Sequence, residues 1–137
     1  MIVVSACLAG VACRYDGTAF PCGKAVKLVE SGQAVCVCPE VLGRLSIPRP
    51  PAEIVGERII TVAGQDVTDQ YQEGAAAALQ IALKAGCHQA ILKARSPSCG
   101  SGKIYDGSFS GKIVDGDGIF AQMLKQAGIA VYTDEEF

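Results

Sequence analysis

The sequence lacks the features that would place it in a membrane, in the secretory route or on a nucleic acid. No apolar run approaches the roughly 18 residues of a transmembrane helix, and no basic segment with an apolar stretch opens the chain as in a signal peptide. Twelve basic and 14 acidic residues give a net charge of −2, too little positive charge for broad contact with a phosphate backbone. We therefore expect a soluble, cytoplasmic protein that binds no membrane and no nucleic acid polymer, and we predict no particular oligomeric state.

Histidine is scarce, whereas cysteine is abundant. His88 is the only histidine, which excludes histidine-rich zinc, copper and non-haem iron sites. The chain has seven cysteines, an odd number that cannot pair completely within one molecule. In a reducing compartment, clustered cysteines bind metal or carry out chemistry more often than they form disulfides. The cysteines are therefore the first candidates for a functional site.

The order of apolar segments predicts the fold. We expect one domain over residues 1–137, with buried strands at 2–7, 34–37, 89–94 and 129–133. Helices are expected at 24–30, 68–85 and 118–127, a hairpin-like strand at 58–63, and loops at 8–21, from residue 38 onward and at 96–111. Strands that alternate with helices indicate an α/β, Rossmann-like layered domain with a mostly parallel sheet flanked by helices.

Four cysteines occupy equivalent places in this predicted sheet. Cys7, Cys38 and Cys99 lie at or just beyond the carboxyl end of a strand, and Cys13 lies in the loop after the first strand. Because the carboxyl ends of parallel strands meet at one edge, the four thiols should converge there in a metal or cluster site. The other three cysteines are interpreted as ordinary small side chains, namely Cys22, Cys36 and Cys87.

The spacing of the four thiols narrows the choice of metal. Three or four thiolates suit structural zinc or an iron–sulfur cluster. The thiols come singly from separate loops, unlike the paired C-x2-C ligands of zinc ribbons, and their spacing differs from that of ferredoxins. A cluster that does not serve as an electron carrier therefore fits best.

Polar side chains accompany these thiols. Glu40 follows Cys38 by two residues, and Ser96 and Ser98 precede Cys99. A carboxyl group in a partly apolar pocket can acquire a pKa near neutrality and transfer protons. The alternatives are a surface or helix-capping carboxylate for Glu40 and turn-capping hydroxyls for the two serines.

Six blocks of the sequence resemble a known family. They are Ser5-Ala6-Cys7-Leu8, Cys13-Arg14-Tyr15-Asp16-Gly17, Cys38-Pro39-Glu40, Pro48-Arg49-Pro50-Pro51-Ala52-Glu53-Ile54, Ser96-Pro97-Ser98-Cys99-Gly100 and Ile104-Tyr105-Asp106-Gly107. Together, and in this order, they resemble the bacterial thiouracil desulfidase family, long catalogued as a domain of unknown function. The resemblance covers nearly the whole chain, so the set is far more specific than any one block.

This resemblance implies an enzyme with a [4Fe–4S] cluster held by only three cysteines, which leaves one iron open as a Lewis acid. The implied reaction is the non-redox desulfuration of a thiolated pyrimidine, such as 2-thiouracil, to uracil and sulfide. The substrate is a small thiolated base or nucleoside. The alternative is a non-catalytic, cysteine-rich module that binds zinc or an iron–sulfur cluster or hands sulfur to a partner.

The resemblance also implies roles for individual residues. We expect Cys7, Cys13 and Cys99 to hold the cluster, with Cys38 either a neighbour or a fourth ligand. Glu40 would transfer protons, and Ser96 would orient the substrate or water. The remaining pocket residues would contact the pyrimidine edge, or a phosphate if the substrate is a nucleotide, or would fix loops; they are Arg14, Tyr15, Asp16, Arg49 and Ser98.

Overall fold

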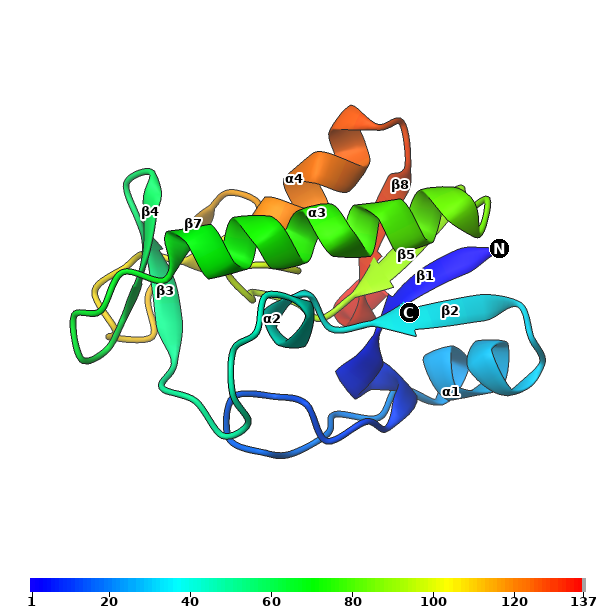
Figure 1. Ribbon diagram of the computed structural model, residues 1–137, viewed down its shortest axis with the longest axis horizontal. Helices are drawn as coiled ribbons and strands as arrows, with labels where there is room; N and C mark the ends of the chain where they lie inside the picture. Colours follow the sequence, from blue (N-terminus) through cyan, green and yellow to red (C-terminus); the bar gives the residue numbers. More distant parts are fainter. Residues whose placement is uncertain (137) are drawn as a thin grey trace.

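A four-stranded parallel sheet forms the centre of the protein in a computed structural model that describes residues 1–136. The strands occur in the order β2 (Ala34–Val37), β1 (Ile2–Ser5), β5 (Gln89–Leu92) and β8 (Ala130–Thr133), and all neighbours are parallel (Figure 1). Parallel sheets with short β-branched strands are normally covered on both faces. The predicted α/β architecture with a mostly parallel sheet is confirmed.

Helices cover both faces of the sheet. On one face α3 (Thr68–Lys84) and α4 (Ile119–Gln126) pack on Val3, Ala90 and Leu92, in a core that is almost completely buried. On the other face α1 (Gly23–Glu30) packs near Val4 and Ile91. Successive side chains of a strand point to opposite faces, so β1 and β5 contribute apolar residues to both cores. Figure 1 shows α3 running across the sheet.

Two small antiparallel hairpins lie outside this sheet. The first pairs β3 (Ala52–Val55) with β4 (Arg58–Thr61), and the second pairs β6 (Lys103–Tyr105) with β7 (Ile113–Asp115). In Figure 1 they lie at the end of the molecule toward which the strands of the central sheet run. The prediction of a loop over 96–111 was wrong for β6, because a three-residue strand is too short to show an alternating pattern.

Short helices follow three of the central strands. The first strand ends at Ser5 rather than at residue 7, and a 3₁₀ helix, η1 (Ala6–Ala9), carries Cys7. The segment after Cys38 begins with α2 (Pro39–Leu42) instead of a loop. Pro39 stops a strand, but its fixed φ also suits the first position of a helix, and the prediction considered only the first effect. A second 3₁₀ helix, η2, spans Asp134–Glu136.

The remaining predicted elements agree with the structure to within two residues at each end. Within residues 1–136, the helices are too short or too polar for any of them to cross a membrane.

Candidate active site

The short helix α2 is fixed by an unusually close approach to α3. A Cβ atom added to Gly74 would lie 1.8 Å from the backbone oxygen of Pro39, and one added to Gly43 would lie 2.0 Å from the backbone oxygen of Gln70. Only glycine permits two helical backbones to approach so closely. This contact holds Glu40, the second residue of α2, at the carboxyl edge of the sheet.

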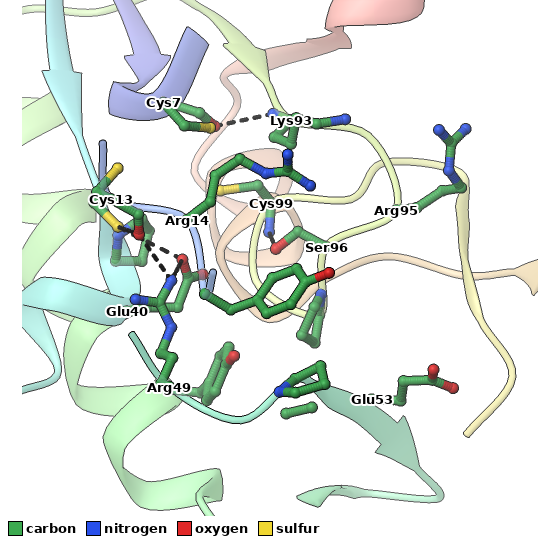
Figure 2. Close-up of a pocket in the computed structure, with 18 of the residues that line it drawn as sticks. Cys7, Cys13, Arg14, Glu40, Arg49, Glu53, Lys93, Arg95, Ser96 and Cys99 are labelled. Carbon is green, nitrogen blue, oxygen red and sulfur yellow. Dashed lines mark hydrogen bonds and ion pairs between the residues drawn. The ribbon is translucent and has the colours of Figure 1, made fainter. Parts of the chain in front are cut away.

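The structure brings four thiols to one cavity of about 590 Å³. Cys7 comes from η1 after β1, Cys13 from the loop that follows, Cys38 from the end of β2, and Cys99 from the loop after β5. Figure 2 shows Cys7, Cys13 and Cys99 around this space. The convergence expected for parallel strands is therefore present, and the cavity has the volume of a typical small-molecule site.

The other three cysteines do not line this cavity. Cys22 is half-buried beside α1, Cys36 is exposed on β2, and Cys87 is buried in the core between α3 and β5. Their positions agree with ordinary packing roles.

The protein environment raises the pKa of three of the cavity thiols, those of Cys13, Cys38 and Cys99. The Cys38 thiol lowers the pKa of Cys13, but the Cys7 thiol and burial outweigh it and raise the pKa of Cys13 to about 11. The thiol of Cys13 and burial raise the pKa of Cys38, and burial together with Glu40 raises the pKa of Cys99. Thiolates form here when metal binding repays the cost of deprotonation.

The placement of the thiols favours a cluster over a single metal ion. In the part of the chain that the structure describes, no three Cys, His, Asp or Glu side chains are close enough to hold a single metal ion. Four thiols spread around one cavity instead leave space for a group of several atoms. The donor set, thiolates without histidine, is the one that iron–sulfur clusters use.

Glu40 and Arg49 form a buried ion pair beside the thiols. Glu40 Oε2 lies 3.3 Å from Arg49 Nη2 and accepts a hydrogen bond of 3.5 Å from Cys38 Sγ, whereas Glu40 Oε1 is buried and has no hydrogen-bond partner in the part of the chain that the structure describes. Burial raises the pKa of Glu40, and the charge of Arg49 opposes this effect. Arg49 also donates to the backbone oxygens of Cys13 (3.0 Å) and Ser46 (3.2 Å), so it fixes two loops as well as the carboxylate.

The two serines of the loop after β5 differ in position. Ser96 lines the cavity, and its Oγ accepts the backbone N–H groups of Ser98 and Cys99, both at 3.0 Å. This is the turn-capping arrangement, and it leaves the hydroxyl proton free to donate.

Two residues expected in the pocket lie elsewhere. Ser98 is completely buried behind the cavity wall, and its Oγ has no hydrogen-bond partner among residues 1–136. Its backbone oxygen accepts the N–H groups of Phe120 and Ala121 at the start of α4, which holds the side chain inside the core. Asp16 is exposed and accepts hydrogen bonds from the backbone and hydroxyl of Thr18, which fixes its own turn.

Arg14 and Tyr15 do line the cavity, together with cations and rings that the sequence did not indicate. Lys93 Nζ lies 4.3 Å from the centre of the Phe20 ring and 3.6 Å from Asp134 Oδ2. The Arg14 guanidinium lies 5.4 Å from the same ring and 5.9 Å from that of Tyr15. One side of the cavity is therefore both aromatic and positively charged.

Comparison with known proteins identifies the family of this chain. The sequence model of the family described as 2-thiouracil desulfurase matches residues 2–136. The chain belongs to this family. The resemblance recognised in the six sequence blocks is therefore confirmed.

Two relatives of this desulfurase-family chain extend the comparison. A solved structure named [4Fe-4S]-dependent thiouracil desulfidase TudS is 43% identical, with a TM-score of 0.93 over 99% of this chain and 91% of that one. The Bacillus subtilis (strain 168) protein YbbK, described as uncharacterized, is 48% identical over 146 residues, covering 99% of this chain and 97% of YbbK.

Sequence reasoning missed several residues of the desulfurase-family cavity. Lys93 and Arg95 line it, and both lie within three residues after the carboxyl end of β5, so the rule that located the cysteines could also have found them. Tyr71 lies on α3, and it also lines the cavity, where burial and Glu40 raise its pKa. No sequence signal separated it from a core tyrosine.

Proposed function

We propose that this protein removes sulfur from a small thiolated pyrimidine such as 2-thiouracil and releases uracil and sulfide without a redox change. One observation carries the proposal: a buried carboxyl group, Glu40, stands beside four thiols that line a single cavity. Family membership and the similarity to a [4Fe-4S]-dependent thiouracil desulfidase support it.

The cofactor in this proposal is a [4Fe–4S] cluster held by Cys7, Cys13 and Cys99. When bound, the cluster supplies a Lewis-acidic iron that matches the soft sulfur of a thiocarbonyl group. Cys38 is assigned a different role because its Sγ contacts Glu40 Oε2 at 3.5 Å and the backbone oxygen of Cys13 at 3.9 Å. It therefore orients the carboxyl group rather than a metal.

Glu40 serves as the proton-transfer group. The oxygen of water forms a bond to the thiocarbonyl carbon, and one water proton passes to Glu40. The carbon–sulfur bond then breaks, and sulfur leaves as hydrosulfide with the second water proton. The proton on Glu40 passes to this hydrosulfide or to solvent, which restores the carboxylate. Burial raises the pKa of Glu40, which suits a group that must both accept and donate a proton. Ser96, with its oxygen occupied by two N–H groups, donates to the substrate or to water.

The proposed function is tested with Glu40→Gln in anaerobically reconstituted protein. We expect the visible absorbance of the cluster to remain and sulfide release from 2-thiouracil to fall by at least about 100-fold, the usual contribution of a general acid or base. Glu30→Gln, at the exposed end of α1, is the matched control and should retain activity. Turnover unchanged in Glu40→Gln would remove this residue from the mechanism.

The reconstituted parent protein also tests whether the substrate is a nucleotide and whether the protein is an enzyme or a non-catalytic module. A thiolated nucleotide assayed in parallel shows whether Arg14 and Lys93, which line the cavity, favour a phosphate. Tight zinc binding without iron uptake would instead support the non-catalytic module.

A further inference from the structure

The segment that contains Glu53 and the segment that contains Gly107 and Phe109 have no role in the proposed chemistry, and they meet at one side of the cavity. Glu53, on β3, accepts hydrogen bonds through Oε1 from the backbone N–H groups of Gly107 (3.0 Å) and Phe109 (3.2 Å). The acceptor is separated from these donors by more than 50 residues of sequence, so the contact joins the two hairpins. Figure 2 shows Glu53 on the opposite side of the pocket from Cys13 and Glu40.

We call residues 106–112, which connect β6 to β7, the strap. Its ends are closed by a hydrogen bond from the N–H of Asp106 to the backbone oxygen of Lys112 (3.0 Å). At Gly107 the φ angle is +93°, and an added Cβ would lie 2.7 Å from the backbone oxygen of Ile54. The strap backbone therefore rests directly on β3, and glycine is required where the two meet.

Phe109 is held in a conformation that its side chain disfavours. Its φ angle is +57°, in the left-handed region that residues with a Cβ rarely adopt. The hydrogen bond from its N–H to Glu53 helps to maintain this backbone. Strained residues of this kind occur at sites that bind ligands, where the surrounding structure fixes them. Here the consequence is that half-buried Phe109 lines the cavity.

Of the four other aromatic rings that line the cavity, those of Phe20, Tyr15 and Tyr71 are engaged or buried, and the hydroxyl of Tyr105 interacts with Arg95. Phe20 has Lys93 and Arg14 over its ring, and Tyr15 has Arg14 over its ring. Tyr71 is 5% exposed. Phe109 is half-buried, and no cation is found over its ring among residues 1–136, so its face is available to a planar ligand.

We propose that Phe109 is the surface on which the substrate pyrimidine stacks and that Glu53 is the positioning residue that holds Phe109 there. This inference rests on the proposed function, because it takes a flat heterocycle as the substrate. Aromatic side chains bind such rings by stacking, which discriminates planar from non-planar ligands without any charge. Phe109 thus holds the ring from one side of the cavity, while Glu40 and the thiols act on its thiocarbonyl group from the other.

The first experiment measures hydrogen exchange of the apoprotein, which needs neither cluster nor turnover. Glu53→Ala removes the acceptor, so exchange at the amides of Gly107 and Phe109 should accelerate by about 10-fold or more, the loss expected for one hydrogen bond to a charged group. Glu57→Ala, exposed in the turn of the same hairpin, should leave both amides as protected as in the parent. Equal exchange in the parent and in Glu53→Ala would overturn the positioning role.

The second experiment measures KM and kcat separately on the reconstituted protein. Phe109→Leu keeps an apolar side chain but loses the ring, so KM for 2-thiouracil should rise by about 10-fold while kcat changes less than about twofold. Phe109→Tyr should restore the parent KM. The same KM in Phe109→Leu as in an active parent would overturn this inference and leave the proposed function intact. A parent protein loaded with its cluster but inactive would overturn the proposed function and, with it, the role of Phe109.

Discussion

At the scale of single residues, two ion pairs beside the cavity are largely buried. Arg49 and Glu40 expose 7% and 13% of their side chains, and Lys93 and Asp134 expose 14% and 7%. Asp134 also accepts the backbone N–H of Ala94, so this pair fixes the chain just after β5. Both pairs therefore hold segments that carry cavity residues.

Removal of one partner from the Arg49–Glu40 pair should be costly. Arg49→Ala leaves a buried carboxylate without its cation and removes a donor from each of two backbone oxygens, so we expect a loss of about 3 kcal/mol in the free energy of unfolding. Urea unfolding of the apoprotein measures it. Arg44→Ala is the control, because the Arg44–Glu73 pair is 77% and 56% exposed and should contribute less than about 1 kcal/mol. Equal losses in the two variants would show that Arg49 has no special structural role.

The proposed cluster ligands predict how much iron is bound when a cavity cysteine, or one outside the cavity, is replaced. Replacement of Cys7, Cys13 or Cys99 by serine should abolish iron uptake on anaerobic reconstitution. Cys22→Ser, outside the cavity, should bind as much iron as the parent, and so should Cys38→Ser, although with lower turnover because Glu40 loses a contact. Analysis of iron and acid-labile sulfide measures the cluster content of each variant relative to the parent. Loss of iron in Cys38→Ser would make Cys38 a ligand and change the proposed set.

At the scale of secondary structure elements, the contact between α2 and α3 determines where Glu40 lies. Gly74→Ala would place a Cβ atom 1.8 Å from the backbone oxygen of Pro39, so the helices must separate. We expect a loss of about 2 kcal/mol or more in stability and a fall in kcat as Glu40 shifts. Gly23→Ala, with open space around the added methyl group, should lose neither stability nor activity. Thermal unfolding and sulfide release test both variants.

The start of α3 gives a pH-dependent prediction. Asp66 accepts hydrogen bonds from the backbone and hydroxyl of Thr68 and pairs with Arg58, and these contacts, that of Arg58 foremost, lower its pKa. A carboxylate with a lowered pKa stabilises the fold above its ordinary pKa of 3.8, and this stabilisation is lost as the pH falls further. Asp66→Asn should therefore lower the melting temperature at pH 7, with a difference that narrows below pH 3.8. A constant difference at every pH would contradict this linkage, and Asp69→Asn in the same turn should cost less.

The longer elements and the hairpin-like strand at 58–61 could be predicted from the sequence, whereas the hairpin of β6 and β7 could not. The helix from Thr68 to Lys84 repeats apolar residues at helical spacing over 17 residues, and a periodic pattern of this length identifies a helix from sequence alone. In β7, Ile113, Val114 and Asp115 are all exposed, so no burial pattern marks them as a strand. Their pairing with β6 depends on contacts far away in the sequence, including the one between Glu53 and the strap.

At the scale of the whole molecule, the parallel sheet explains why the site could be located from sequence. The residues that follow strands β1, β2 and β5 all lie at one edge of the sheet. Cys7, Cys38 and Cys99 therefore meet there although they are far apart in the chain. The same logic did not reveal Phe109, which reaches the cavity from a hairpin outside the sheet. It also placed Ser98 in the pocket, because position along a loop does not tell which way a side chain turns.

Anaerobic reconstitution with iron and sulfide, followed by metal analysis and an assay of sulfide released from 2-thiouracil, tests the central claim most directly. The account predicts about four irons per chain and turnover that depends on them. A chain that takes up no iron but binds zinc tightly, and releases no sulfide, would contradict it.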